Sequence, residues 1–286
     1  MTLPDLLRVL DLEQIEDRLF RGRSHHTPWG RVFGGQVLAQ ALLASALTVP
    51  DDRQVHSLHG YFILGGDISK PIVYDVERLR EGRSFTTRRC TAIQKGEAIF
   101  NSATSYHVRE DGLEHQLDMP DVPGPDSLAT SVKLAERYRE AAPALFARLS
   151  RELPIEVRPV DDVNLLRPEA LPPRYRVWLR ADGQLPDDAR LHQAILAYAS
   201  DYHLLTTAVL PHLREVNFGQ LMMTSLDHAM WFHVDDVRVD EWLLFDIDTP
   251  RAAGARGFMR ASVYEKGGRL VASVVQEGLL RKRRAA

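Results

Sequence analysis

Three polar residues in the second half of the chain stand in apolar surroundings. Asp201 falls in a buried-looking helix, Ser225 precedes a strand-like run, and Gln276 lies in the last such run. A carboxylate left unpaired there would cost several kcal/mol, so it needs donors or water. A hydroxyl and a side-chain amide are suitable donors, and the three groups could hold a water molecule whose proton Asp201 accepts. The same pattern also fits a partly solvated helix carboxylate beside a satisfied core amide.

Gly34 and Gly35 open an apolar helix and allow two interpretations. Glycines at a helix start can simply permit close packing against strands. They can also expose backbone N–H groups and the positive end of the helix dipole to an anion or a developing oxyanion. The sequence contains no Gly-x-Ser-x-Gly, no His-Glu-x-x-His and no P-loop pattern, so none of those familiar sites is indicated.

The elements that must position these residues occur twice along the chain. Three segments of the first half recur in the same order in the second half: 57–62 as 225–232, 83–85 as 256–258, and 95–102 as 266–273. Two copies are too few for a solenoid. The repetition therefore predicts a pseudo-symmetric pair that shares one core.

Each half is predicted to contain a strand, a helix and then a run of strands. The first half has a strand at 19–22, a helix from Gly34 with apolar positions through Leu47, and strands at 57–62, 72–78, 84–94 and 97–107. The second has a strand at 177–180, a helix starting near 186–188, and strands at 223–233, 242–249, 257–265 and 269–280. A helix that is apolar on nearly every side should be buried, which favours an α+β fold with a curved antiparallel sheet around it.

We expect three regions in the chain. Residues 1–110 form the first repeat, 111–153 a connector with a charged surface helix at about 131–148, and 154–286 the second repeat. Aligning the helices places Ala44 opposite Asp201, and aligning the strands places Ser57 opposite Ser225 and Ser105 opposite Gln276. Because the first copy lacks the acid and the amide, we predict a scaffolding repeat followed by a catalytic one.

Composition narrows the possible functions. The 286 residues have a net charge of −3, which gives no electrostatic case for nucleic acid. No run approaches the roughly 18 apolar residues that a membrane span requires. A single cysteine, Cys90, excludes an internal disulfide and a cysteine-based zinc site, and we expect a cytoplasmic protein. The basic run 281–284 is either a solvated tail or a contact for a phosphorylated ligand.

Short motifs along the chain resemble the acyl-CoA thioesterase II family. The resemblance runs from about residue 5 to 281, and its motifs lie at 20–22, 32–36, 55–59, 199–201, 226–233, 241–244, 255–258 and 275–278. The resemblance implies a double hotdog fold, in which each repeat has a central helix wrapped by a curved antiparallel sheet. It also implies hydrolysis of fatty acyl-CoA to free fatty acid and CoA, without a metal or cofactor.

The resemblance assigns roles to particular residues. Asp201, Ser225 and Gln276 match the family's catalytic aspartate, threonine or serine, and glutamine, which surround the attacking water. His56 matches a histidine of the family's first repeat, although a histidine with only a core hydrogen bond would look the same in sequence. We therefore expect Gly34, Gly35 and His56 to be the candidate substrate-binding residues, and no metal ligands.

Two other functions remain open at this point. A hotdog enoyl-CoA hydratase or dehydratase would need an acid–base pair. The adjacent candidate is Asp227-His228, but neighbouring strand residues point to opposite faces. A non-catalytic acyl-CoA-binding module would keep the fold without turnover. Because exposed sheet edges seek partners, we expect a homodimer or homotetramer.

Overall fold

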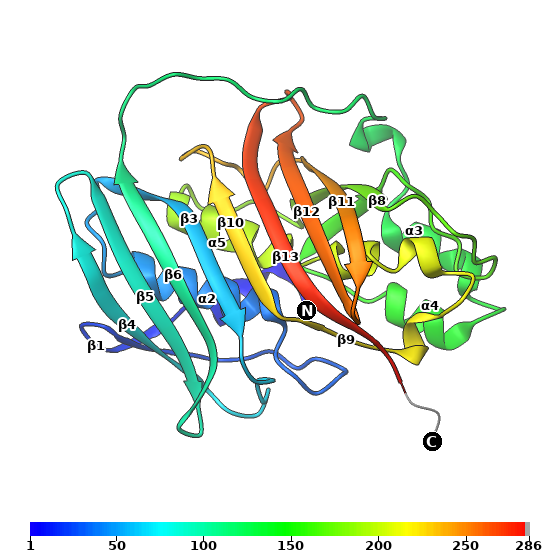
Figure 1. The fold of residues 1–286 in the computed structure, drawn as a ribbon, viewed down its shortest axis with the longest axis horizontal. Coiled ribbons are helices and arrows are strands. Elements are labelled where there is room, and N and C mark those ends of the chain that lie inside the picture. Colours follow the sequence, from blue (N-terminus) through cyan, green and yellow to red (C-terminus); the bar gives the residue numbers. More distant parts are fainter. Residues whose placement is uncertain (284–286) are drawn as a thin grey trace.

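A computed structural model describes residues 1–283, and the helices and strands follow the predicted order twice (Figure 1). The first half contains α1 (Leu3–Leu10), β1 (Glu13–Glu16), β2 (Leu19–Gly22), α2 (Gly34–Ala46), β3 (Arg53–Phe62), β4 (Ile72–Glu81), β5 (Phe85–Gln94) and β6 (Glu97–Val108). The second contains β7 (Ile155–Pro159), β8 (Arg174–Ala181), α5 (Ala189–Ser200), α6 (Leu204–Thr207), β9 (Leu221–Ser225), β10 (Asp227–Phe232), β11 (Leu243–Ala253), β12 (Arg256–Glu265) and β13 (Leu270–Lys282). Among these described residues, no helix is both long and apolar enough to cross a bilayer.

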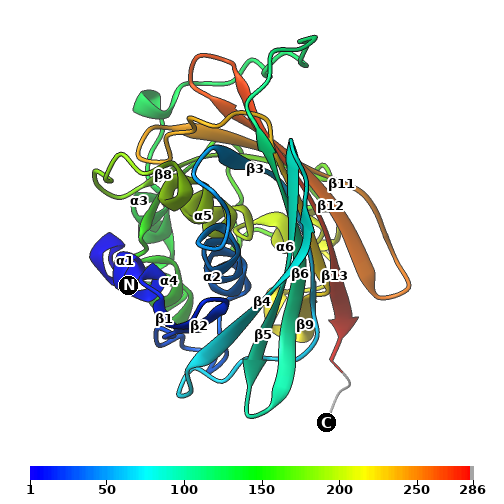
Figure 2. The ribbon, with the colours of Figure 1, turned by 90° about the vertical axis from the view of Figure 1, so that its left-hand side faces the viewer.

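All of these strands belong to one antiparallel sheet. Its order is β1-β2-β4-β5-β6-β3-β10-β13-β12-β11-β8-β7, with β9 paired to β13 off this path. The two halves meet where β3 pairs with β10, from Tyr61 opposite Asp227 to Ser57 opposite Trp231. The sheet curves around α2 and α5, which lie side by side in its concave face (Figure 2). The predicted wrapping of each helix is therefore confirmed.

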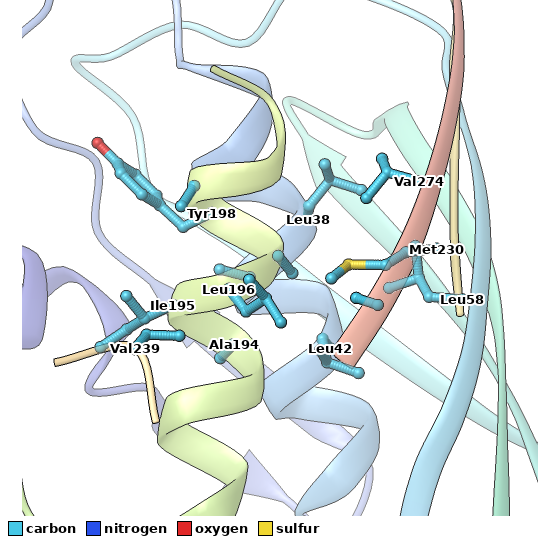
Figure 3. Close-up of a cluster of buried hydrophobic side chains, with 14 of the residues drawn as sticks. Leu38, Leu42, Leu58, Ala194, Ile195, Leu196, Tyr198, Met230, Val239 and Val274 are labelled. Atoms are coloured by element: carbon cyan, nitrogen blue, oxygen red, sulfur yellow. The ribbon is translucent and has the colours of Figure 1, made fainter. Parts of the chain in front are cut away.

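The shared core lies between these two helices and the central strands. Leu38 and Leu42 of α2 and Leu196 of α5 meet side chains of the strands, among them Leu58, Met230 and Val274 (Figure 3). Nearly every residue of α2 is buried, as expected for a helix without a polar face. Leu47 was expected among those buried positions, but it is the C-cap residue and 52% exposed.

Local signals place the ends of several elements. The carboxylate of Asp188 accepts hydrogen bonds from the backbone N–H groups of Arg190 and Leu191, so the predicted start of the second-half helix is confirmed. Lys95 and Gly96 both have positive φ, 52° and 81°, which is the backbone of a two-residue hairpin between β5 and β6.

The connector differs from the prediction in one respect. In place of one helix at 131–148, the chain forms α3 (Ser131–Ala135), a short 3₁₀ turn and α4 (Pro143–Leu149). Pro143 begins the last of these helices, because proline fits the first turn of a helix and disrupts its interior. The segment before α3 arches over the edge of the molecule (Figure 1), and Gln116 holds it to the β12–β13 hairpin through Gly268 and Leu270.

Candidate active site

The structure brings Asp201, Ser225 and Gln276 together. The Gln276 side-chain amide nitrogen, Nε2, lies 2.8 Å from Asp201 Oδ1 and 2.9 Å from Ser225 Oγ, and donates to both. Ser225 Oγ lies 3.5 Å from Asp201 Oδ1, at the outer limit of a hydrogen bond. The three side chains thus surround one small volume, as a water-holding group requires.

The three residues come from one helix end and two strands. Asp201 is the C-cap residue of α5, not an interior helix residue as expected, so its carboxylate projects from the helix end. Ser225 is the last residue of β9 and is paired with Gly278 of β13. Gln276 is fully buried on the inner face of β13, two residues before that glycine. Strand alternation therefore puts the amide and the hydroxyl near the same helix end.

The N-terminus of α2 completes the site from the first repeat. The Gly35 N–H donates to Asp201 Oδ2 over 2.9 Å. A β-carbon at Gly34 would lie 2.7 Å from the same oxygen, and one at Gly35 would lie 2.4 Å from the backbone oxygen of Tyr198. Both proposed reasons for these glycines therefore apply: they allow close packing, and one N–H binds an anion. That anion is the protein's own Asp201.

The surroundings of Asp201 keep its proton affinity high. Burial raises the pKa of its carboxyl to about 6, because removal from water disfavours the charge. The hydrogen bonds from Gln276, Gly35 and Ser225 act in the opposite direction and offset part of this effect. A carboxylate with a pKa near neutrality is suited to accept a proton from water.

The carbonyl oxygen of the Gln276 side chain, Oε1, is buried and has no hydrogen-bond partner among residues 1–283. Buried acceptors of this kind are uncommon in folded proteins. Since the amide nitrogen of the same side chain is held by Asp201 and Ser225, the amide cannot turn without breaking both contacts. Oε1 is therefore a fixed acceptor beside the carboxylate.

One contact in this region has no clear sequence signal. His228, fully buried on β10, places Nε2 2.9 Å from Ser200 Oγ, and that hydroxyl donates to the Ala197 carbonyl. Burial lowers the pKa of His228 to about 3, so the ring is neutral and supports the last turn of α5 beside Asp201. The hydrogen bond links α5 to β10, which is why sequence alone does not reveal it.

His56 lies away from this cluster. Its Nε2 is 2.8 Å from Ser105 Oγ, and its ring packs against Phe85. It is six residues from Phe62, the strand end that faces Gly34, which corresponds to roughly 20 Å along β3. The structure therefore does not bring His56 to Asp201, unlike Gly34 and Gly35.

The strand comparison between repeats also needs correction. Ser105 bonds His56 on the outer side of β6, whereas Gln276 faces the core. The adjacent Thr104 is the buried residue, because alternate strand residues face opposite sides. The position opposite Asp201 is occupied by Ala44, which is fully buried, so the first repeat has no acid there.

Asp227 and His228 do not form an acid–base pair. His228 faces the core and bonds Ser200, whereas the Asp227 carboxylate accepts the backbone N–H of Glu277 over 2.6 Å. Among residues 1–283, no three histidine, cysteine, aspartate or glutamate side chains are arranged to hold a metal ion. The predicted basic run is described only through Arg283, whose Nε donates to the Leu221 carbonyl; Arg284 and the last two residues lie outside the described part.

Two helix-and-sheet repeats with one continuous antiparallel sheet define a double hotdog protein, and the buried acid, hydroxyl and amide define a candidate hydrolase site. A protein with a hot dog fold from Alicyclobacillus acidocaldarius superposes with a TM-score of 0.78 at 19% identity, covering 98% of this chain and 99% of its own.

The family is shown by closer relatives. The sequence patterns described as acyl-CoA thioesterase N-terminal domain and acyl-CoA thioesterase match residues 23–107 and 147–279. Acyl-CoA thioesterase 2 of Haemophilus influenzae is 37% identical over 98% of both chains, and acyl-coenzyme A thioesterase 8 of Mus musculus is 39% identical over 96% of this chain and 88% of its own. The crystal structure of acyl-CoA thioesterase II TesB2 from Mycobacterium marinum has a TM-score of 0.81 at 40% identity, covering 97% of this chain and 98% of its own. This chain belongs to the acyl-CoA thioesterase family, of the TesB-like type II.

Proposed function

We propose that the protein hydrolyses fatty acyl-CoA by direct attack of a water molecule held by Asp201, Ser225 and Gln276. The observation that carries this proposal is the convergence of the three side chains within hydrogen-bonding distance. A raised pKa of about 6 for Asp201 supports its role as general base. Ser225 and Gln276 orient the water so that a lone pair faces the thioester carbonyl.

The proposed reaction has two steps. The water oxygen bonds to the carbonyl carbon while Asp201 takes one of its protons, which leaves a negative charge on the former carbonyl oxygen. Collapse of this intermediate breaks the carbon–sulfur bond, and the coenzyme A thiolate leaves with the electron pair. The proton held by Asp201 then passes to the thiolate, which regenerates the base, and the products are the fatty acid and CoA.

The developing oxyanion needs a hydrogen-bond donor. Gly34 is the first residue of α2, and helix N–H groups at that position have no carbonyl partner within the helix. The Gly35 N–H already bonds Asp201, so Gly34 is our candidate for the oxyanion donor. We leave His56 out of the substrate-binding group because its partner is Ser105.

The same proposal gives each region of the chain a task. Residues 154–286 supply the three catalytic side chains, residues 1–110 supply the helix end that faces them, and residues 111–153 connect the two.

We further propose a cytoplasmic homodimer or homotetramer. Gel filtration with light scattering tests the oligomer, and a mass of one chain would contradict it.

The direct test is the turnover of Asp201→Ala. Loss of the general base should lower kcat by a factor of about 10² to 10⁴, measured as thiol released from a saturated acyl-CoA. Ser225→Ala and Gln276→Ala should cause smaller losses that do not add, since all three residues hold one water. Asp187→Ala removes a fully exposed carboxylate and is the matched control. Wild-type turnover in Asp201→Ala would refute the assignment.

A further inference from the structure

A large cavity is lined by close chain neighbours of two of the proposed catalytic residues. It is a cavity of about 640 Å³ between the connector helices and the C-terminal repeat. Its wall includes Tyr138 of the connector, Tyr175 of β8, Leu210 beyond α6, and Met223 of β9. The catalytic residues Asp201, Ser225 and Gln276 do not line it.

The chain connects this cavity to the site at two points. Met223 and Ser225 lie two residues apart on β9 and share its inner side, because strand side chains alternate. His203 lines the cavity two residues after Asp201, and its φ of +64° turns the chain sharply at that point. The cavity therefore begins within two residues of both the proposed base and the proposed hydroxyl.

The wall of this cavity is suited to an apolar ligand. Tyr138, Val157, Leu210 and Leu221 are each almost fully buried around it. Trp29, which is 62% exposed, stands at its margin and offers a further apolar surface. Large exposed apolar side chains beside a cavity are typical of binding sites.

Most arginine side chains that line this cavity of about 640 Å³ already contact other groups of the protein. Arg137 pairs with Asp162 over 2.8 Å, and Arg283 donates to the Leu221 carbonyl over 3.2 Å. Arg148, exposed on α4, makes no ion pair with the described residues. A phosphate group would have to displace the first two contacts. These contacts disfavour the phosphorylated end of the substrate here and favour its hydrocarbon end.

A smaller cavity of about 310 Å³ has Ser225 in its wall. Gly34, Phe62, Thr224 and Ser225 line it, together with Arg31. Arg31 makes no ion pair with any residue of the described chain, so its guanidinium is available to a phosphate. Ser225 therefore lines the cavity that contains Arg31, whereas Met223, two residues earlier on β9, lines the larger one.

We propose that the acyl chain of the substrate occupies the larger cavity and the coenzyme A arm occupies the smaller one. This assignment rests on the proposed hydrolysis at Ser225, Asp201 and Gln276. Met223 is then a residue that determines chain-length specificity, because it stands where the acyl chain leaves the thioester. Each methylene buried in an apolar cavity is worth about fourfold in kcat/KM.

Two adjacent substitutions on β9 test the assignment. Met223→Trp fills the mouth of the larger cavity, and Thr224→Trp, on the exposed side of the same strand, narrows the smaller one. Met223→Trp should lower the ratio of hexadecanoyl to butanoyl kcat/KM by about 10², as expected if three or four methylenes lose their place. Thr224→Trp should lower kcat/KM for all chain lengths by one common factor and weaken inhibition by free CoA.

The outcomes separate this inference from the proposed function. If wild-type protein releases no thiol from any acyl-CoA, hydrolysis itself is refuted. If hydrolysis occurs but Thr224→Trp alone shortens the chain-length preference, the two cavities are assigned the wrong way round. An unchanged preference in both variants overturns the inference. Thr206→Trp, from an exposed residue on the opposite wall of the larger cavity, repeats the test if Met223→Trp does not fold.

Discussion

The fold destabilises the charged carboxylate of Asp201 and so raises its affinity for a proton. Its carboxylate accepts three hydrogen bonds, yet burial still raises its pKa to about 6 from the ordinary value of 3.8. The folded protein therefore binds a proton at Asp201 more tightly than the unfolded chain does. The charged form needed for catalysis is the form that the fold disfavours, which is common at active sites.

The first prediction at this scale concerns activity and pH. Because Asp201 must be deprotonated to accept a proton, kcat/KM should fall about tenfold per pH unit below about pH 6. A pH profile with a saturated acyl-CoA measures this. A flat profile down to about pH 4 would mean that Asp201 is not the base.

The second prediction for Asp201 concerns the pH dependence of folding stability. The raised pKa of Asp201 contributes stability that is complete below about pH 4 and is lost as the pH rises through about 6. The loss is about 3 kcal/mol at most. Compared with wild type, Asp201→Asn should therefore become progressively more stable between about pH 4 and pH 7. Thermal unfolding of both proteins measures the difference between their stabilities. If this difference stays constant from about pH 4 to pH 7, the pKa of Asp201 is not raised in the folded protein.

At the scale of elements, the site depends on how closely α2 approaches α5. The first turn of α2 contacts the last turn of α5, and only glycine fits at Gly35, where a β-carbon would lie 2.4 Å from the Tyr198 carbonyl. The same approach lets the Gly35 N–H reach Asp201. Helix packing and carboxylate positioning thus have one structural cause.

Gly35→Ala should therefore damage both stability and activity. Overpacking against a fixed backbone costs about 1–3 kcal/mol, and separation of the helices should remove the hydrogen bond to Asp201. We expect a lower Tm together with a drop in kcat of at least about tenfold. Gly267→Ala, in a turn with open space around it, is the control and should change neither. Normal kcat in Gly35→Ala would show that the contact is not needed.

At the scale of the molecule, the two repeats form one structure. They share the sheet through the β3–β10 pairing and the core through α2 and α5. The proposed catalytic carboxylate belongs to the second repeat, and its Gly35 partner belongs to the first. Neither half contains a complete site.

A split protein tests this dependence. The chain can be divided between Gly112 and Leu113, where the connector is exposed and contacts little. Fragments 1–112 and 113–286 should hydrolyse acyl-CoA when they are co-expressed, because the β3–β10 interface can form between them. Each fragment alone should be inactive. Turnover by the second fragment alone would mean that the first repeat is dispensable.

Much of this arrangement was predictable because it depends on local pattern. The apolar runs of α2 and α5 indicate burial, the recurrence of motifs indicates two similar halves, and Asp188 marks a helix start. The chemistry of Asp201, Ser225 and Gln276 followed from their polar character in apolar surroundings, together with the family resemblance. Apart from the recurrence and the resemblance, each of these signals lies within a few residues of sequence.

Tertiary structure alone decided how those residues meet. Gly35 and Asp201 are 166 positions apart, so no local pattern could show that an N–H of one repeat binds the acid of the other. The same reason explains the separation of His56 from the site, the role of Ser200 beside His228, and the two cavities lined by Met223 and Ser225 of β9. Residue types determine which groups can react, whereas chain folding over long distances determines which of them share a volume.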